Sequence, residues 1–270
     1  ASDVYKRQRF TLPMIIGSLL QQCYNIADTL IVGQCIGSGA LAAVGSAYTL
    51  MVFLISILLG LSMGSGTVFS LQYGAGRMKA LRRSIYVSAV LIGTVTIVLN
   101  IAALSFIHPI LKLLQIPDDI YQMMYDYLWI IFWGIGFTFI YNFYAALLRA
   151  IGNAVTPLYF LAISVVLNIG LDLFFILLLD WGIKGAAIAT IIAQGVSALG
   201  IMGYTYAKCP ELRLHRNDLH FDRHCLKEIT SFSTLTCIQQ SVMNLGILMV
   251  QGLVLSLIHI SEPTRHAQIS

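Results

Sequence analysis

Long runs of apolar residues, separated by short polar connections, make up most of this chain. Each run is about 20 residues or longer, the length that an α-helix needs to cross the hydrocarbon core of a bilayer. A membrane β-barrel would instead show alternating strands of about ten residues. We therefore predict an all-α, polytopic membrane protein with seven transmembrane helices, at residues 12–36, 45–73, 85–107, 121–148, 158–179, 185–207 and 229–255.

The connections between these runs alternate in charge. Those after the second, fourth and sixth runs are basic, whereas the intervening ones carry only Lys112 and Lys184, beside aspartates. Since cytosolic loops of membrane proteins are enriched in Lys and Arg, the alternation predicts a cytosolic N-terminus. The basic residues on that side are Arg77, Lys79, Arg82, Arg83, Arg149, Lys208, Arg213, Arg216, Arg223 and Lys227.

Composition supports the membrane assignment. The 270 residues are 58% hydrophobic and only 10% charged, against about 25% charged residues in a soluble domain. The net charge of +4 follows from the basic loops and gives no reason to expect nucleic-acid binding. The five cysteines follow no metal-ligand spacing, so we predict no metal centre built from them.

The two ends differ from the rest of the chain. Residues 1–8 and 256–270 resemble translated sequencing-library adapter, and we exclude both from fold reasoning. The remaining sequence divides into a six-helix unit at 9–207, a charged linker at 208–228 and one further helix at 229–255. A short amphipathic segment at 108–117 is expected to lie at the outer membrane surface.

The sequence begins to repeat after the linker. Residues 239–250 align without gaps with residues 21–32, and such internal repeats are typical of transporters. Gly246 stands at the place of Asp28. Any carboxylate site therefore belongs to the first unit. A separate pattern, the Gly-x-x-x-Gly pairs at 33–37 and 60–64, predicts close helix packing.

Asp28 lies in the first apolar run, where a carboxylate is energetically unfavourable. A carboxylate at membrane depth costs about 2.5–3.5 kcal/mol on insertion scales, so such groups mark ion or substrate paths. Gln21, Tyr24 and Asp28 recur at three- and four-residue steps and share one helical face. Pro13 lies earlier in the same run, where it can bend the helix.

Further polar residues occur in the later runs. Asn168 and Asp172 are four residues apart, as are Thr190 and Gln194, so each pair shares a helical face. Asn142 lies alone in the fourth run.

The predicted orientation places Asp28, Asp172 and Thr190 in the outer half of the bilayer, where they can form one pocket. Asn142 would lie nearer the cytosol. Two carboxylates in such a site can bind a proton, Na⁺ or an organic cation in competition, which is the minimum requirement for antiport.

In these residues the chain resembles the multidrug and toxic compound extrusion (MATE) family, in its DinF-like branch. The resemblance implies two six-helix lobes around a cleft, of which this chain holds the N-lobe and the first helix of the C-lobe. The rest of the C-lobe would be the missing partner, and the chain alone would be inactive. The segments that carry the resemblance are 26–33, 147–153, 167–172 and 182–190.

The resemblance also implies roles for individual residues. The cation-binding network, for H⁺ or Na⁺, would consist of Asp28, Asn168, Asp172 and Thr190. Tyr24 and Gln21 would line the pocket, and the first helix would bend at Pro13. A branch of the family places an acidic residue for sodium in the seventh helix, where this chain has Gln239 and Gln240. The second sodium site is therefore not expected here.

The implied function is a cation-coupled antiporter in the bacterial cytoplasmic membrane, exporting cationic or amphiphilic drugs by alternating access. It would be neither an enzyme nor dependent on a cofactor beyond the coupling ion. One alternative is a flippase of lipid-linked oligosaccharides, but only Arg149 lies near these helices to meet phosphates. Another is an intramembrane aspartyl protease using Asp28 and Asp172, although the Gly-x-Gly-Asp motif is absent. A seven-helix receptor is the third.

Overall fold

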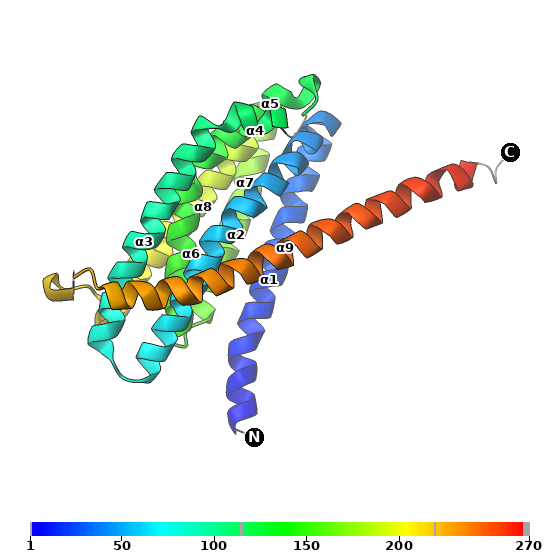
Figure 1. The fold of residues 1–270 in the computed structure, drawn as a ribbon. Coiled ribbons are helices and arrows are strands. Elements are labelled where there is room, and N and C mark those ends of the chain that lie inside the picture. Colours follow the sequence, from blue (N-terminus) through cyan, green and yellow to red (C-terminus); the bar gives the residue numbers. More distant parts are fainter. Residues whose placement is uncertain (1, 114–115, 219, 267–270) are drawn as a thin grey trace.

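The computed structural model describes residues 2–113, 116–218 and 220–266, and parts of the predicted segments 1–8, 108–117, 208–228 and 256–270 fall outside these ranges. The described part is helical throughout, with no strand in it (Figure 1). In chain order its elements are α1 (Ser2–Cys35), α2 (Ser38–Gly74), α3 (Met78–Ser105), α4 (Ile107–Leu113), α5 (Asp118–Trp133), α6 (Ile135–Ala150), α7 (Val155–Leu173), the π-helix η1 (Phe174–Leu178), α8 (Gly182–Lys208), the 3₁₀ turns η2 (Pro210–Leu212) and η3 (Arg216–Asp218), and α9 (Arg223–His266).

The predicted membrane spans compare well with these helices. By length and apolar composition, α2, α3, α8 and the segment Val155–Leu178 can each cross a membrane, and α5 with α6 adds a fifth span if the bent pair counts as one. The runs at 12–36 and 229–255 fall in α1 and α9, which are not among the spans found in the described part of the chain. Polar positions interrupt both, so their spanning stays a prediction.

One predicted helix is broken. The run at 121–148 forms α5 and α6, which meet at Gly134 with a bend of 46°. A Cβ atom at position 134 would lie 2.8 Å from Cγ1 of Ile191, so only glycine allows α8 to approach this closely. Asn100 of α3 donates a side-chain hydrogen bond to the carbonyl of Phe132 beside the break. The expectation of one continuous helix was therefore wrong, because tertiary packing at a glycine bends it.

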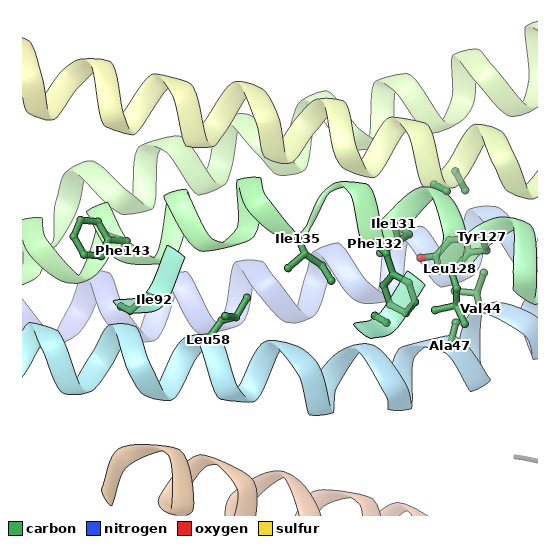
Figure 2. Close-up of a cluster of buried hydrophobic side chains, with 14 of the residues drawn as sticks. Val44, Ala47, Leu58, Ile92, Tyr127, Leu128, Ile131, Phe132, Ile135 and Phe143 are labelled. Atoms are coloured by element: carbon green, nitrogen blue, oxygen red, sulfur yellow. The ribbon is translucent and has the colours of Figure 1, made fainter. Parts of the chain in front are cut away.

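The core lies between α2 and the α5–α6 pair. Figure 2 shows Leu128 and Phe132 of α5 beside the α2 side chains Val44 and Ala47, with Phe143 of α6 further along. Leu128 and Phe132 are fully buried. Large apolar side chains also cover the outside, where Val166 is 73% exposed. An apolar exterior suits lipid, and since lipid is as apolar as the core, close packing is the main stabilising term.

The two Gly-x-x-x-Gly pairs behave differently. Figure 1 shows α9 crossing α2 obliquely, and Cβ atoms at Gly60 and Gly64 would lie 2.6 Å and 2.4 Å from the Cα atoms of Cys237 and Ser233. Close helix packing is therefore confirmed for this pair. At the other pair, a Cβ atom at Gly33 would lie 3.4 Å from Cδ2 of Leu41 in α2, so Gly33 does lie in a helix contact. Gly37 instead has φ 120° in the turn after α1, with nothing within 4 Å of a Cβ atom, so the packing interpretation was wrong for Gly37.

The charged linker is held against the start of α3. Nε of Arg82 lies 2.9 Å from Oδ2 of Asp218, and an Nη atom of Arg83 lies 3.2 Å from Oδ2 of Asp222. The Ser84 hydroxyl lies 2.9 Å from Sγ of Cys225, inside the first turn of α9. These contacts fix where α9 leaves the linker.

Candidate functional site

Four polar residues from three helices gather in the interior. Asp28 comes from α1, Asn168 and Asp172 from α7, and Thr190 from α8. Their relative exposures are 8%, 0%, 0% and 7%, respectively, so all four are withdrawn from the surface. The sequence predicted this grouping from helical spacing and depth. We call these four residues the carboxylate cluster.

The Thr190 hydroxyl connects the three helices. Its Oγ1 accepts a hydrogen bond from the Tyr24 hydroxyl of α1 and another from Nδ2 of Asn168 of α7, both at 3.4 Å. The carboxyl groups of Asp28 and Asp172 lie close enough to interact electrostatically, although no hydrogen bond joins them. The cluster is thus one connected unit.

Several oxygen atoms of the cluster have no donor. Oδ1 of Asp28, Oδ1 of Asn168 and both carboxylate oxygens of Asp172 are buried and accept no hydrogen bond from any donor in the described part of the chain. The ion pairs among the described residues also leave out both aspartates. Buried acceptors are costly when unpaired. Protons and hard cations such as Na⁺ are the ligands that this set of oxygens fits.

Helix packing explains why these residues meet. Asn168 and Asp172 are one turn apart on α7, whose regular hydrogen bonding ends at Leu173, where η1 begins. Such π-turns are frequent at functional sites. Gly17 of α1 lies against Leu158 of α7, with 3.8 Å between its ideal Cβ and the leucine Cδ1.

On the other side of α7, α8 is held by a hydrogen bond from the Ser197 hydroxyl to the Phe160 carbonyl, 2.9 Å long. These contacts set the depth of each polar side chain.

Tyr127 of α5 also belongs to the site, although the sequence did not single it out. It is buried, and its hydroxyl lies close enough to interact electrostatically with Asp28, Tyr24 and Asp172. Figure 2 shows it at the end of the core beside Val44. The fourth apolar run contains several tyrosines, and nothing in their spacing distinguishes this one. Only the packing of α5 against α2 and α8 brings it to the site.

Three predicted residues do not join the cluster. Gln21 is exposed on α1, and none of the described side-chain hydrogen bonds involves it. Asn142 lies in α6, beyond the Gly134 bend, and donates from Nδ2 to the carbonyl of Thr138, 2.8 Å away in its own helix. Pro13 lies inside α1, which continues through it. Its bending role stays a prediction.

Comparison with known proteins identifies the family of the chain. The MatE family model matches residues 13–174. The probable multidrug resistance protein YpnP of Bacillus subtilis is 36% identical over 190 residues, which are 70% of this chain and 43% of that protein. The probable multidrug resistance protein NorM of Thermotoga maritima is 28% identical over 253 residues, or 92% of this chain and 54% of that protein. The chain thus spans about half the length of these relatives.

Solved structures show the same fold. An outward-facing multidrug resistance MATE transporter superposes with a TM-score of 0.83 at 24% identity, covering 92% of this chain and 55% of that one. The matched family region includes Asp28, Asn168 and Asp172. Members of the family are transporters and not enzymes, which removes the protease interpretation. The chain belongs to the MATE family of multi-pass membrane transporters.

Proposed function

We propose that this chain contributes the cation-coupling lobe of an antiporter that exports cationic or amphiphilic compounds. The observation that carries the proposal is the set of unpaired buried oxygens on Asp28, Asn168 and Asp172. These acceptors stay without a partner until a proton or cation enters the site. We place the coupling H⁺ or Na⁺ there, with Thr190 and Tyr24 as further oxygen donors.

Coupling follows from competition for the same negative charge. A cation entering from outside neutralises the carboxylate cluster and weakens its attraction for a cationic drug, which then leaves outward. One charge moving down a potential of 100 mV releases about 2.3 kcal/mol. A bend of α1 at Pro13 would change the pocket as the cluster changes charge, because a proline removes one helical hydrogen bond.

The charge of the site favours cationic substrates. Its ionisable carboxyl groups are Asp28 and Asp172, and Arg149 lies at the far end of α6. A carrier of phosphate-bearing lipid-linked sugars would need cations near the substrate. Relatives are described as multidrug resistance proteins, which agrees with a drug-like substrate.

The proposed setting is the bacterial cytoplasmic membrane, with the N-terminus in the cytosol. The start of α3 and the linker lie at the same end of the lobe, since Arg82 and Arg83 pair with Asp218 and Asp222. Both segments are rich in Lys and Arg, and the positive-inside rule assigns such an end to the cytosol. Because the chain spans about half of its relatives, we propose that the second lobe of the same transporter completes the cleft.

The test is drug efflux from everted membrane vesicles that hold the transporter containing this chain. Asp28→Asn and Asp172→Asn should each abolish efflux driven by a proton or Na⁺ gradient. Asp126→Asn is the matched control, since Asp126 of α5 pairs with Lys184 at 3.2 Å, outside the carboxylate cluster. Efflux at the wild-type rate in the Asp172→Asn variant would refute the proposal. Residues 1–270 alone should show no efflux.

A further inference from the structure

Polar contacts continue from the carboxylate cluster along the interface of α6 and α8. Gln194 lies one turn beyond Thr190 on α8, on the same face. Its Oε1 accepts a hydrogen bond from the Thr138 hydroxyl of α6, with 3.0 Å between the oxygens. One turn further, Nδ2 of Asn142 donates to the Thr138 carbonyl at 2.8 Å. We call Gln194, Thr138 and Asn142 the polar file. It runs away from the cluster, toward the C-terminal end of α6.

The bend at Gly134 lies between the cluster and this file. It separates Tyr127, which lies at the cluster on α5, from Thr138, which lies four residues into α6. Gly195 of α8 also packs against the Phe137 ring, with 3.5 Å between its ideal Cβ and the ring. Broken helices at membrane depth are typical of ion sites in transporters.

Burial distinguishes the file from ordinary interhelical hydrogen bonds. Ser197, also on α8, is 2% exposed, and its hydroxyl donates to a backbone carbonyl. Thr138, Asn142 and Gln194 are only half-buried. Each also keeps an oxygen that can receive a cation or its hydrating water. The file thus joins a buried site to a more accessible region, which a purely structural contact does not require.

We propose that Thr138, Gln194 and Asn142 form the inner part of the path by which the coupling cation leaves the carboxylate cluster. The inference rests on the proposed antiport function. A cation released from Asp28 and Asp172 passes the Thr190 hydroxyl and is then solvated by the Gln194 carbonyl and the Thr138 hydroxyl. The side-chain oxygen of Asn142 follows toward the end of α6, the end that carries the basic loops.

The test separates binding from passage. In proteoliposomes of the transporter containing this chain, ethidium efflux is driven by an imposed pH gradient and, separately, by an Na⁺ gradient. Binding of the same cations at equilibrium is followed by intrinsic tryptophan fluorescence. The double variant Thr138→Val with Gln194→Leu should bind cations with an unchanged midpoint but export about tenfold more slowly, the effect of losing about one hydrogen bond in the rate-limiting barrier.

Matched variants control for folding. Thr138→Ser keeps the hydroxyl and should keep wild-type efflux, and Thr205→Val, which removes an α8 hydroxyl bonded only to the Ile201 carbonyl of its own helix, should export normally. Wild-type efflux in the double variant would overturn the inference, as would loss of cation binding together with efflux, since the residues would then belong to the cluster. If the unmodified transporter shows no cation-driven efflux at all, the proposed function fails and the path with it.

Discussion

The hydroxyl of Tyr24 in α1 donates a hydrogen bond to Oγ1 of Thr190 in α8, across 3.4 Å and 166 positions of sequence. The same Thr190 oxygen accepts from Asn168 of α7. A small hydroxyl thereby fixes three helices around Asp28 and Asp172. If α1 moves, this hydrogen bond must break or α8 must move with it. The position of the first helix is thereby coupled to the contacts around Asp28 and Asp172.

The strength of this contact can be measured with a double-mutant cycle. Tyr24→Phe and Thr190→Val each remove one side of the hydrogen bond, and we expect a coupling energy of about 0.6 kcal/mol, the average found between membrane helices. Thr190→Val should cost more than Tyr24→Phe, because it also deprives Asn168 of its acceptor. Thermal unfolding of the purified chain in detergent gives the values. If the effects of the two single variants simply add in the double variant, the two side chains do not interact and the hydrogen bond is contradicted.

The carboxylate cluster should lower the stability of the folded chain. Asp172→Asn replaces a buried acceptor pair with an amide that can donate to Oδ1 of Asp28 or of Asn168, so we expect a gain of about 1–2 kcal/mol in unfolding free energy. The stabilisation of the wild type by added Na⁺ or acid should disappear in this variant. Asn168→Asp is the reverse control, since a third carboxyl group should destabilise the lobe. A less stable Asp172→Asn protein would show that the carboxylate is paired.

The α2–α9 contact depends on two glycines. Gly64→Ala places a methyl group 2.4 Å from Cα of Ser233, a backbone atom that cannot turn away. Overpacking of this kind costs about 1–3 kcal/mol. Gly45→Ala, also in α2 but with nothing within 4 Å, should be neutral. Cysteine-accessibility labelling of Cys237 should rise only in the Gly64→Ala variant, and unchanged labelling would argue against close packing.

The linker contact should depend on pH. Burial of Asp218 opposes ionisation, but the His215 N–H and the Arg82 guanidinium, at 3.0 Å and 2.9 Å, stabilise the carboxylate and hold its pKa below the ordinary aspartate value. A lowered folded-state pKa gives stability that is fully present above the unfolded value, near about 3.9, and is lost as pH falls further.

Asp218→Asn should therefore cost about 1 kcal/mol at pH 7, and the difference from wild type should shrink as pH falls below about 4. Unfolding midpoints measured between these pH values check the prediction. Asp119→Asn, at an exposed aspartate, provides the control. A difference that grows on acidification would mean that the carboxylate is not stabilised by Arg82.

Much of the site could be anticipated from the order of residues alone. Apolar run length gave the helices, because bilayer thickness sets a minimum length. Spacing of three and four placed Asn168 beside Asp172, because an α-helix has 3.6 residues per turn. The charge of the loops predicted the orientation of the helices, and hence a similar depth in the bilayer for Asp28, Asp172 and Thr190. All of these are local or nearly one-dimensional properties.

Tertiary structure decided what depends on contacts between distant helices. Tyr127 of α5 joined the site, and Gln194 of α8 gained Thr138 of α6 as a partner. The run that holds Tyr127 and Thr138 bends at Gly134, where Ile191 of α8 leaves no room for a Cβ atom. The sequence by itself determined the helices, their faces and the costly charges within them. Which faces meet was fixed only in the folded lobe, because van der Waals packing, unlike helical periodicity, is set by residues far apart in the chain.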